Sequence, residues 1–186
     1  MSLARRDLET RDLLAAEGSL YAGYHAEMER VHRENAAALE RILDEVGWPG
    51  VELAGEDGAE AAWLIAQHAI GSPAFQRRCL AALEAAAAAN KVPAWQPAML
   101  LDRIRVFEGR PQVYGTSFDW DEQGLMSPLP IEEARTVDER RAAVGLPPLA
   151  EAIVRHREQA VGEPQPSHYK ARRREMEAWA RRVGWR

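Results

Sequence analysis

The chain has 186 residues, of which 46% are hydrophobic and 28% are charged, and its formal net charge at pH 7 is −5. This length favours one domain with a hydrophobic core, and the composition is that of an ordinary globular protein. The single cysteine, Cys79, excludes an internal disulfide framework and a structural zinc site built from several thiolates.

The charge is unevenly distributed along the chain. Residues 168–186 hold seven Lys/Arg and two Glu, a net charge of +5, which leaves −10 for residues 1–167. Because nonspecific nucleic-acid binding needs a broad cationic surface, no nucleic-acid partner is expected. No apolar run approaches the roughly 20 residues that span a bilayer, and the N-terminal residues lack the pattern of a secretory signal. We therefore expect a cytoplasmic protein without a membrane partner.

Three helices are predicted in the first half of the chain. Residues 11–46 contain no proline, and apolar residues recur there at steps of three and four, which predicts one long amphipathic helix ended by Gly47. A second helix is expected from about residue 58 to residue 68 or 69. A third is expected over residues 73–90, with Ser72 as its N-cap and a proline at its first position.

A fourth helix is predicted from about residue 97 to residue 107, before Gly109. Residues 112–118 are rich in β-formers, and a turn at 121–124 leads into 125–131, which predicts a small irregular hairpin. Residues 136–139 form a capping box for a fifth helix, and a sixth follows from residue 149 to about residue 160.

The predicted fold class is mainly α, a single-domain helical bundle with a small irregular β-hairpin. We place the helical domain at residues 1–161, a linker at 162–167 and a basic amphipathic C-terminal helix at 168–186.

Five motifs follow one another along this framework: GWP at 47–49, AWLIAQH at 62–68, DR at 102–103, QVYGT at 112–116 and RRAAVGL at 140–146. In this order they resemble a bacterial family known only as a domain of unknown function, over roughly residues 35–150. The resemblance implies no activity and no catalytic residue.

His68 is the first candidate for chemistry. It shares the apolar face of the second helix with Leu64 and Ile65 and lies in the last helical turn. The helix dipole favours the imidazolium there whereas burial favours the neutral ring, and such opposing influences suit a general acid or base. The alternative is a core histidine that donates a hydrogen bond to a backbone carbonyl.

Arg103 is the second candidate, because helical phasing places its stem on the packed side of the fourth helix. A guanidinium there needs a carboxylate or an anionic ligand, so we expect Arg103 to bind an anionic substrate, with Arg141 as a supporting group. Asp102 projects about 100° away from Arg103 and is expected to orient His68 or Arg103. In the alternative, Arg103 braces the hairpin and Asp102 pairs with Arg105 or Arg141.

Gln112, Tyr114 and Thr116 alternate along the predicted hairpin. In an extended segment all three face the same side, and an amide, a phenol and a hydroxyl together can recognise a ligand. Tyr114 could donate a proton or a hydrogen bond to an oxyanion. The alternative is a strand on which Tyr114 covers the core.

A metal site is not predicted. His25, Glu29 and His32 lie on one face of the first predicted helix, but the two histidines are about 10 Å apart along its axis, too far to share an ion. A solvated helix face is the better explanation for this trio. His156 and His168 are assigned no role, and no cofactor motif is present.

These predictions combine into a small-molecule enzyme that uses acid/base chemistry at His68 and an Arg103 anion clamp, without metal or cofactor. The site is expected between the end of the second helix, the fourth helix and residues 112–116. The alternative is a non-catalytic module that binds a ligand or partner and in which the same polar cluster is structural. A homo-oligomer formed through the long first helix or the basic tail is left open.

Overall fold

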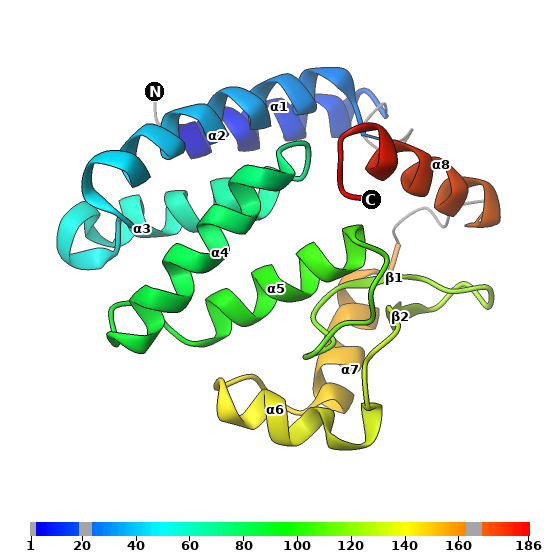
Figure 1. Cartoon of the computed structure of the whole chain (residues 1–186). Helices are drawn as coiled ribbons and strands as arrows, with labels where there is room; N and C mark the ends of the chain where they lie inside the picture. Colours follow the sequence, from blue (N-terminus) through cyan, green and yellow to red (C-terminus); the bar gives the residue numbers. More distant parts are fainter. Residues whose placement is uncertain (1–2, 19–23, 163–168) are drawn as a thin grey trace. The chain divides into compact units, whose positions relative to one another are not determined.

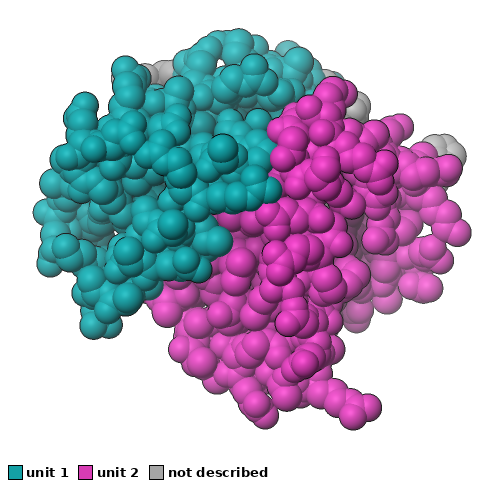
Figure 2. All heavy atoms as spheres, in the orientation of Figure 1, with its two compact units in different colours: residues 1–92 teal, residues 93–186 magenta. Residues whose placement is uncertain are grey.

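The computed structural model describes residues 3–18, 24–162 and 169–186. Within those ranges it contains eight α-helices, one short 3-10 helix and one two-stranded antiparallel sheet (Figure 1), so the predicted mainly α class is confirmed. The chain divides into two compact units, an N-terminal unit of residues 1–92 and a C-terminal unit of residues 93–186 (Figure 2). None of the described helices is both long and apolar enough to cross a bilayer.

The N-terminal unit is built from four helices: α1 (Leu3–Ala16), α2 (Ala26–Val46), α3 (Val51–His68) and α4 (Pro73–Ala88). Helix α1 contacts α2 and α3, and α3 also contacts α2 and α4. The side chains of Leu39 and Leu83 are fully buried. Cys79 is buried as well, and burial raises the pKa of its thiol to about 12, which agrees with a structural thiol.

The prediction of one helix over residues 11–46 is wrong. Helix α1 ends at Ala16 and Gly18 follows with a φ of +73°, whereas α2 begins only at Ala26. His25 caps α2, because its Nδ1 atom accepts a hydrogen bond of 3.2 Å from the backbone N–H of Glu27. The apolar periodicity hides this break, since a cap depends on one local hydrogen bond that periodicity does not report.

The next two helices follow the sequence more closely. Helix α3 ends at His68 as predicted but begins at Val51, and its first turn is separated from the rest by Gly55, whose φ of 70° and ψ of 176° are not helical. Helix α4 begins at Pro73 as predicted. Ser72 occupies the N-cap position, but its side chain makes no capping hydrogen bond.

The C-terminal unit contains the remaining elements: α5 (Trp95–Phe107), β1 (Phe118–Trp120), β2 (Met126–Pro128), the 3-10 helix η1 (Ala134–Thr136), α6 (Val137–Ala143), α7 (Leu149–Gln159) and α8 (Tyr169–Arg182).

The predicted hairpin is present but shorter, and β1 pairs with β2 so that Asp119 lies opposite Ser127. Residues 113–117 form an irregular loop instead of a strand, and Gln112 makes an isolated bridge to Ile131. At the start of α6 the predicted capping box is absent, since Thr136 makes no capping hydrogen bond with its side chain.

The basic C-terminal helix packs within the C-terminal unit. Phe107, at the end of α5, contacts Trp179 edge-on at 5.7 Å and stacks on Trp185 at 5.4 Å between ring centroids. Arg172 forms an ion pair with Asp119 of β1. The contacts of α8 are therefore aromatic as well as ionic. Most of the predicted linker, from residue 163 onward, lies outside the described residues.

Candidate functional site

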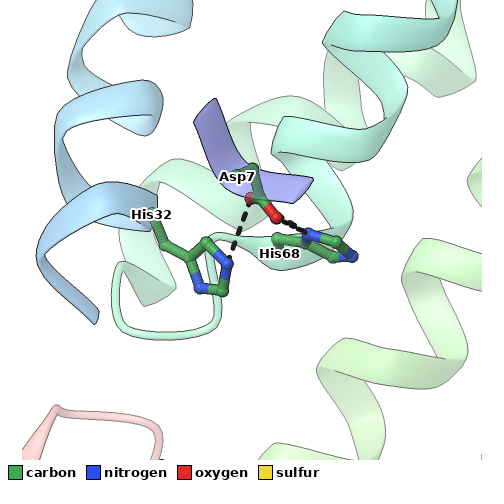
Figure 3. Close-up of side chains that lie close together, drawn as sticks. All are labelled: Asp7, His32 and His68. Atoms are coloured by element: carbon green, nitrogen blue, oxygen red, sulfur yellow. Dashed lines mark hydrogen bonds and ion pairs between the residues drawn. The ribbon is translucent and has the colours of Figure 1, made fainter. Parts of the chain in front are cut away.

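Three polar side chains meet in the N-terminal unit, and each comes from a different helix. Asp7 lies on α1, His32 on α2 and His68 at the end of α3 (Figure 3). The His68 Nδ1 atom lies 3.1 Å from both Asp7 carboxylate oxygens, and the His32 Nε2 atom lies 3.1 Å from Asp7 Oδ2. The Asp7 side chain is 1% exposed. The geometry is that of one buried carboxylate shared by two imidazoles.

Asp7 and His32 meet because each lies on the buried face of its helix. Asp7 and Leu14 are seven residues apart and are the buried residues of α1. His32 follows Met28 by four residues and precedes Leu39 by seven, and all three are buried on α2. Each polar group therefore occupies a position that helical periodicity assigns to the core.

The Asp7 carboxyl is held in its ionised form. Burial alone raises the pKa of Asp7, but the interactions with His32 and His68 outweigh burial and lower this pKa well below its usual value. A negative charge therefore persists among the three helices throughout the neutral range.

His32 is also held from its other side. The Tyr24 hydroxyl lies 2.7 Å from His32 Nδ1, and the two rings stack with centroids 5.7 Å apart. Burial, followed by the charges of Glu29 and Asp7, raises the pKa of Tyr24, so the phenol remains neutral. His32 Nε2 is buried and, despite its distance of 3.1 Å from Asp7, lacks a hydrogen bond of good geometry to any described residue.

The trio weighed from the sequence does not form a common site. His25 caps α2 and Glu29 pairs with Arg33 at 2.7 Å, whereas His32 contacts Asp7. The expectation of a solvated face is wrong for His32, which is only 9% exposed. Asp7 was missed because the first predicted helix began at residue 11, so Asp7 lay outside every predicted helix.

Asp102 is the centre of a second polar cluster, in the C-terminal unit. Its carboxylate is fully buried and accepts hydrogen bonds from the backbone N–H groups of Val113, Tyr114 and Thr116 at 2.7 to 3.2 Å. It also accepts one from the Thr116 hydroxyl at 3.0 Å. Its hydrogen bonds within the described part of the chain all lead to this loop, and none leads to His68 or Arg103. Asp102 therefore shapes the loop 113–116.

Gln112 and Gly115 shape the same loop. The fully buried Gln112 amide donates to the carbonyls of Ser117 and Leu129 and accepts from the Ser117 N–H at 2.6 Å. Gly115 has a φ of +67°, and a Cβ there would lie 2.5 Å from Ile131 Cδ1, so only glycine fits without strain. The segment is bent, and the single polar face expected from alternation is not formed.

Two arginines brace this loop from α6. Arg141 is 2% exposed and donates to the carbonyls of Tyr114 at 2.7 Å and Pro147 at 2.6 Å. Its burial lowers the pKa of this guanidinium. Arg140 donates to the Val113 carbonyl at 2.7 Å. Arg141 was predicted to support anion binding, but its guanidinium donates its hydrogen bonds to backbone carbonyls instead.

Arg103 differs from these two arginines. Its Nε atom is buried without a hydrogen-bond partner, and no carboxylate of the described residues pairs with its guanidinium. Burial lowers the pKa of Arg103 to about 10, so the group remains cationic at pH 7. It lines a cavity of about 460 Å³ together with residues of the loop, the hairpin, α7 and α8. The prediction placed Arg103 on the packed side of α5, but Arg103 is half-buried there, whereas Asp102 is fully buried.

His156 of α7 lines the same cavity and was given no role from the sequence. Its ring stacks on Phe118 of β1, with centroids 3.9 Å apart and an interplanar angle of 23°. Burial, and secondarily the charges of Arg155 and Arg141, lower the pKa of His156, so its ring is neutral at pH 7. Arginines stand on both sides of His156 in the sequence, which suggested a solvent-exposed position. The stacking of His156 on Phe118 is visible only in the folded structure.

The predicted site residues are therefore divided between the two units. His68 belongs to the Asp7 cluster, whereas Asp102, Arg103, Gln112, Tyr114, Thr116 and Arg141 belong to the C-terminal unit.

Comparison with known proteins gives one result. Residues 14–164 match a family described as "Family of unknown function (DUF6624)", a range that includes His32, His68 and Arg103 and begins after Asp7. No curated protein and no solved structure matches the chain. Since the matched range covers most of the chain and contains the ordered motifs, the protein belongs to the DUF6624 family, whose function is unknown.

Proposed function

We propose that the protein is an enzyme that acts on a small polar or anionic molecule, with His68 as general acid/base and Asp7 as the residue that positions it. The observation that carries this proposal is the contact of 3.1 Å between His68 Nδ1 and the buried Asp7 carboxylate. Because this contact uses Nδ1, the Nε2 atom of the same ring can exchange a proton with a substrate. The His68 side chain is 27% exposed, which gives a substrate access.

Asp7 contributes in two ways. Its hydrogen bond fixes the tautomer in which Nδ1 carries the proton and Nε2 is the acceptor. When Nε2 accepts a proton, the adjacent carboxylate stabilises the imidazolium that forms. A carboxylate with a lowered pKa provides this support across the neutral range.

Arg103, in the C-terminal unit, is the proposed anion-binding group of the protein. Its support is a guanidinium that borders a cavity, has a buried Nε atom without a hydrogen-bond partner and pairs with no carboxylate of the described residues. The proposal assigns Asp102, Gln112 and Arg141 to shaping the loop that borders this cavity, rather than to proton transfer. The non-catalytic alternative remains a binding module with the same Arg103 cavity.

Replacing His68 by glutamine is the direct test of the enzyme. Wild-type protein is incubated with a library of carboxylated and phosphorylated metabolites, and turnover is followed by mass spectrometry. We expect His68→Gln to lower turnover by roughly 10²- to 10⁴-fold, the usual contribution of a general acid or base, in a variant that circular dichroism shows to be folded at the assay temperature. His25→Gln, which changes a histidine outside the cluster, serves as the matched control. Equal turnover in His68→Gln and wild type would rule out the acid/base role.

A divalent metal ion is a second candidate for the same cluster. Asp7, His32 and His68 each offer one ligand atom, and these atoms all lie within 4.8 Å of one another. The observation that favours a metal is His32 Nε2, which is buried without a hydrogen bond while Tyr24 holds Nδ1 of the same ring. Two imidazoles and a carboxylate suit zinc or iron, and a partner on the second ring nitrogen is typical of metal-binding histidines.

Cobalt provides the measurement for the metal candidate. On titration with Co²⁺ we expect visible absorption bands that reach saturation at one ion per chain. His32→Gln should abolish these bands, whereas His156→Gln should leave them unchanged. If His32→Gln leaves the spectrum and the stoichiometry as in the wild type, the cluster is not the metal site.

A further inference from the structure

The cavity beside Arg103 has one unmatched positive charge. The titratable groups that line it are Arg103, Asp119, His156 and Arg172. Arg172 is neutralised by its ion pair with Asp119. His156 is neutral at pH 7, because burial lowers its pKa. Among the described groups that line the cavity, only the guanidinium of Arg103 lacks a compensating charge, so one negative charge on a ligand would balance the cavity.

The partial burial of Arg103 makes this charge significant. The residue is half-buried, and its Nε atom is buried without a hydrogen-bond partner among the described residues. A polar atom buried without a partner is costly, and a carboxylate can satisfy a guanidinium with two parallel hydrogen bonds. The neighbouring arginines show how the fold satisfies its other cations: Arg105 pairs with Glu132, and Arg141 donates to backbone carbonyls. Arg103 is the exception among them, and it borders open space.

The remaining walls of the cavity are largely apolar. Val106 and Phe107 line it from α5, Met126 from β2 and Met176 from α8. Phe118 also lines the cavity, and the His156 ring stacks on it. Methionine sulfur and aromatic rings pack favourably on flat aromatic groups. At about 460 Å³ the cavity lies within the usual range for small-molecule sites.

We propose that this cavity binds a small aromatic carboxylate, with the carboxylate on Arg103 and the ring between Phe118 and the methionine side chains. The proposal rests on the Arg103 part of the proposed function and not on His68. A single positive charge favours a monoanion over a dianion such as HPO₄²⁻, which makes up a large share of inorganic phosphate at pH 7. The apolar walls select a ligand with a hydrophobic body over a small hydrophilic anion.

The test uses the full-length protein and benzoate as the probe, with calorimetric titration at pH 7. We expect saturable binding of benzoate at one site per chain. Benzyl alcohol, which keeps the ring but lacks the charge, and inorganic phosphate, which lacks the ring, should each bind at least tenfold more weakly.

Variants locate the site. Arg103→Met should weaken benzoate binding at least tenfold, because the guanidinium that would hold the carboxylate is replaced by an apolar side chain of similar length. The matched control is Arg155→Met, which changes an exposed arginine of α7 and should leave the affinity unchanged.

The outcomes separate this proposal from the acid/base proposal. His68→Gln should bind benzoate as the wild type does, even where it loses turnover. The aromatic carboxylate site is overturned if the wild type shows no saturable benzoate binding, if phosphate binds as tightly as benzoate, or if Arg103→Met retains wild-type affinity.

Discussion

Replacing Asp102 by alanine is expected to lower the free energy of unfolding by about 4 kcal/mol, because each buried donor left without an acceptor costs about 1–3 kcal/mol. Three backbone N–H groups and the Thr116 hydroxyl depend on this one carboxylate. Urea unfolding followed by tryptophan fluorescence measures the loss.

Asp121 offers a matched control. Its carboxylate also accepts hydrogen bonds from backbone N–H groups, those of Gln123 and Leu125 at 2.9 Å, but in an exposed turn. Water replaces the lost acceptor there, so Asp121→Ala should destabilise the protein much less. Similar losses in the two variants would contradict the assignment of Asp102 as the buried centre of the loop.

Replacing Asp7 by asparagine is expected to destabilise the protein at pH 7 by about 3 kcal/mol, the cost of breaking a buried charge pair. The effect depends on pH. The pKa of Asp7 is lowered in the folded protein from roughly 3.9 in the unfolded chain. Its contribution to stability is therefore complete above about pH 5 and is lost as the pH falls through the unfolded value towards the folded one.

Urea midpoints measured between pH 2 and pH 7 give this dependence. The difference between wild type and Asp7→Asn should be largest at neutral pH and should shrink steadily below about pH 5. Asp12→Asn, an exposed position on the same helix, is the control and should follow the wild-type curve. A difference that stays constant down to pH 2 would show that Asp7 is not ionised in its pair.

Helical phasing was the most reliable guide from sequence to structure. It assigned the packed side of α5 to Arg103, although Asp102 is the fully buried residue there, but it ended α3 at His68 and predicted that a charged Asp102 within an apolar pattern requires a partner. The partner of Asp102 could not be identified from the sequence. It consists of backbone N–H groups, which do not depend on the type of side chain. Any residue type could have supplied the donors of Val113 and Tyr114.

The Asp7 cluster illustrates a different limit. Its three residues are 25 or more positions apart and lie on three helices, so only their packing brings them together. A histidine on an apolar face is a visible signal, and His68 was found from it. Asp7 lies in the part of α1 before residue 11, where no helix was predicted, and its burial follows from contacts of α1 with α2 and α3.

The position of α8 has a consequence for how a ligand reaches Arg103. One wall of the cavity comes from Arg172 and Met176, early in α8, whereas the helix is fastened at its other end by Trp179 and Trp185 on Phe107. The stretch of α8 over the cavity is held by the Arg172–Asp119 ion pair, which water and salt can loosen. The rate of ligand exchange would then rise with ionic strength, while the aromatic end keeps the helix attached.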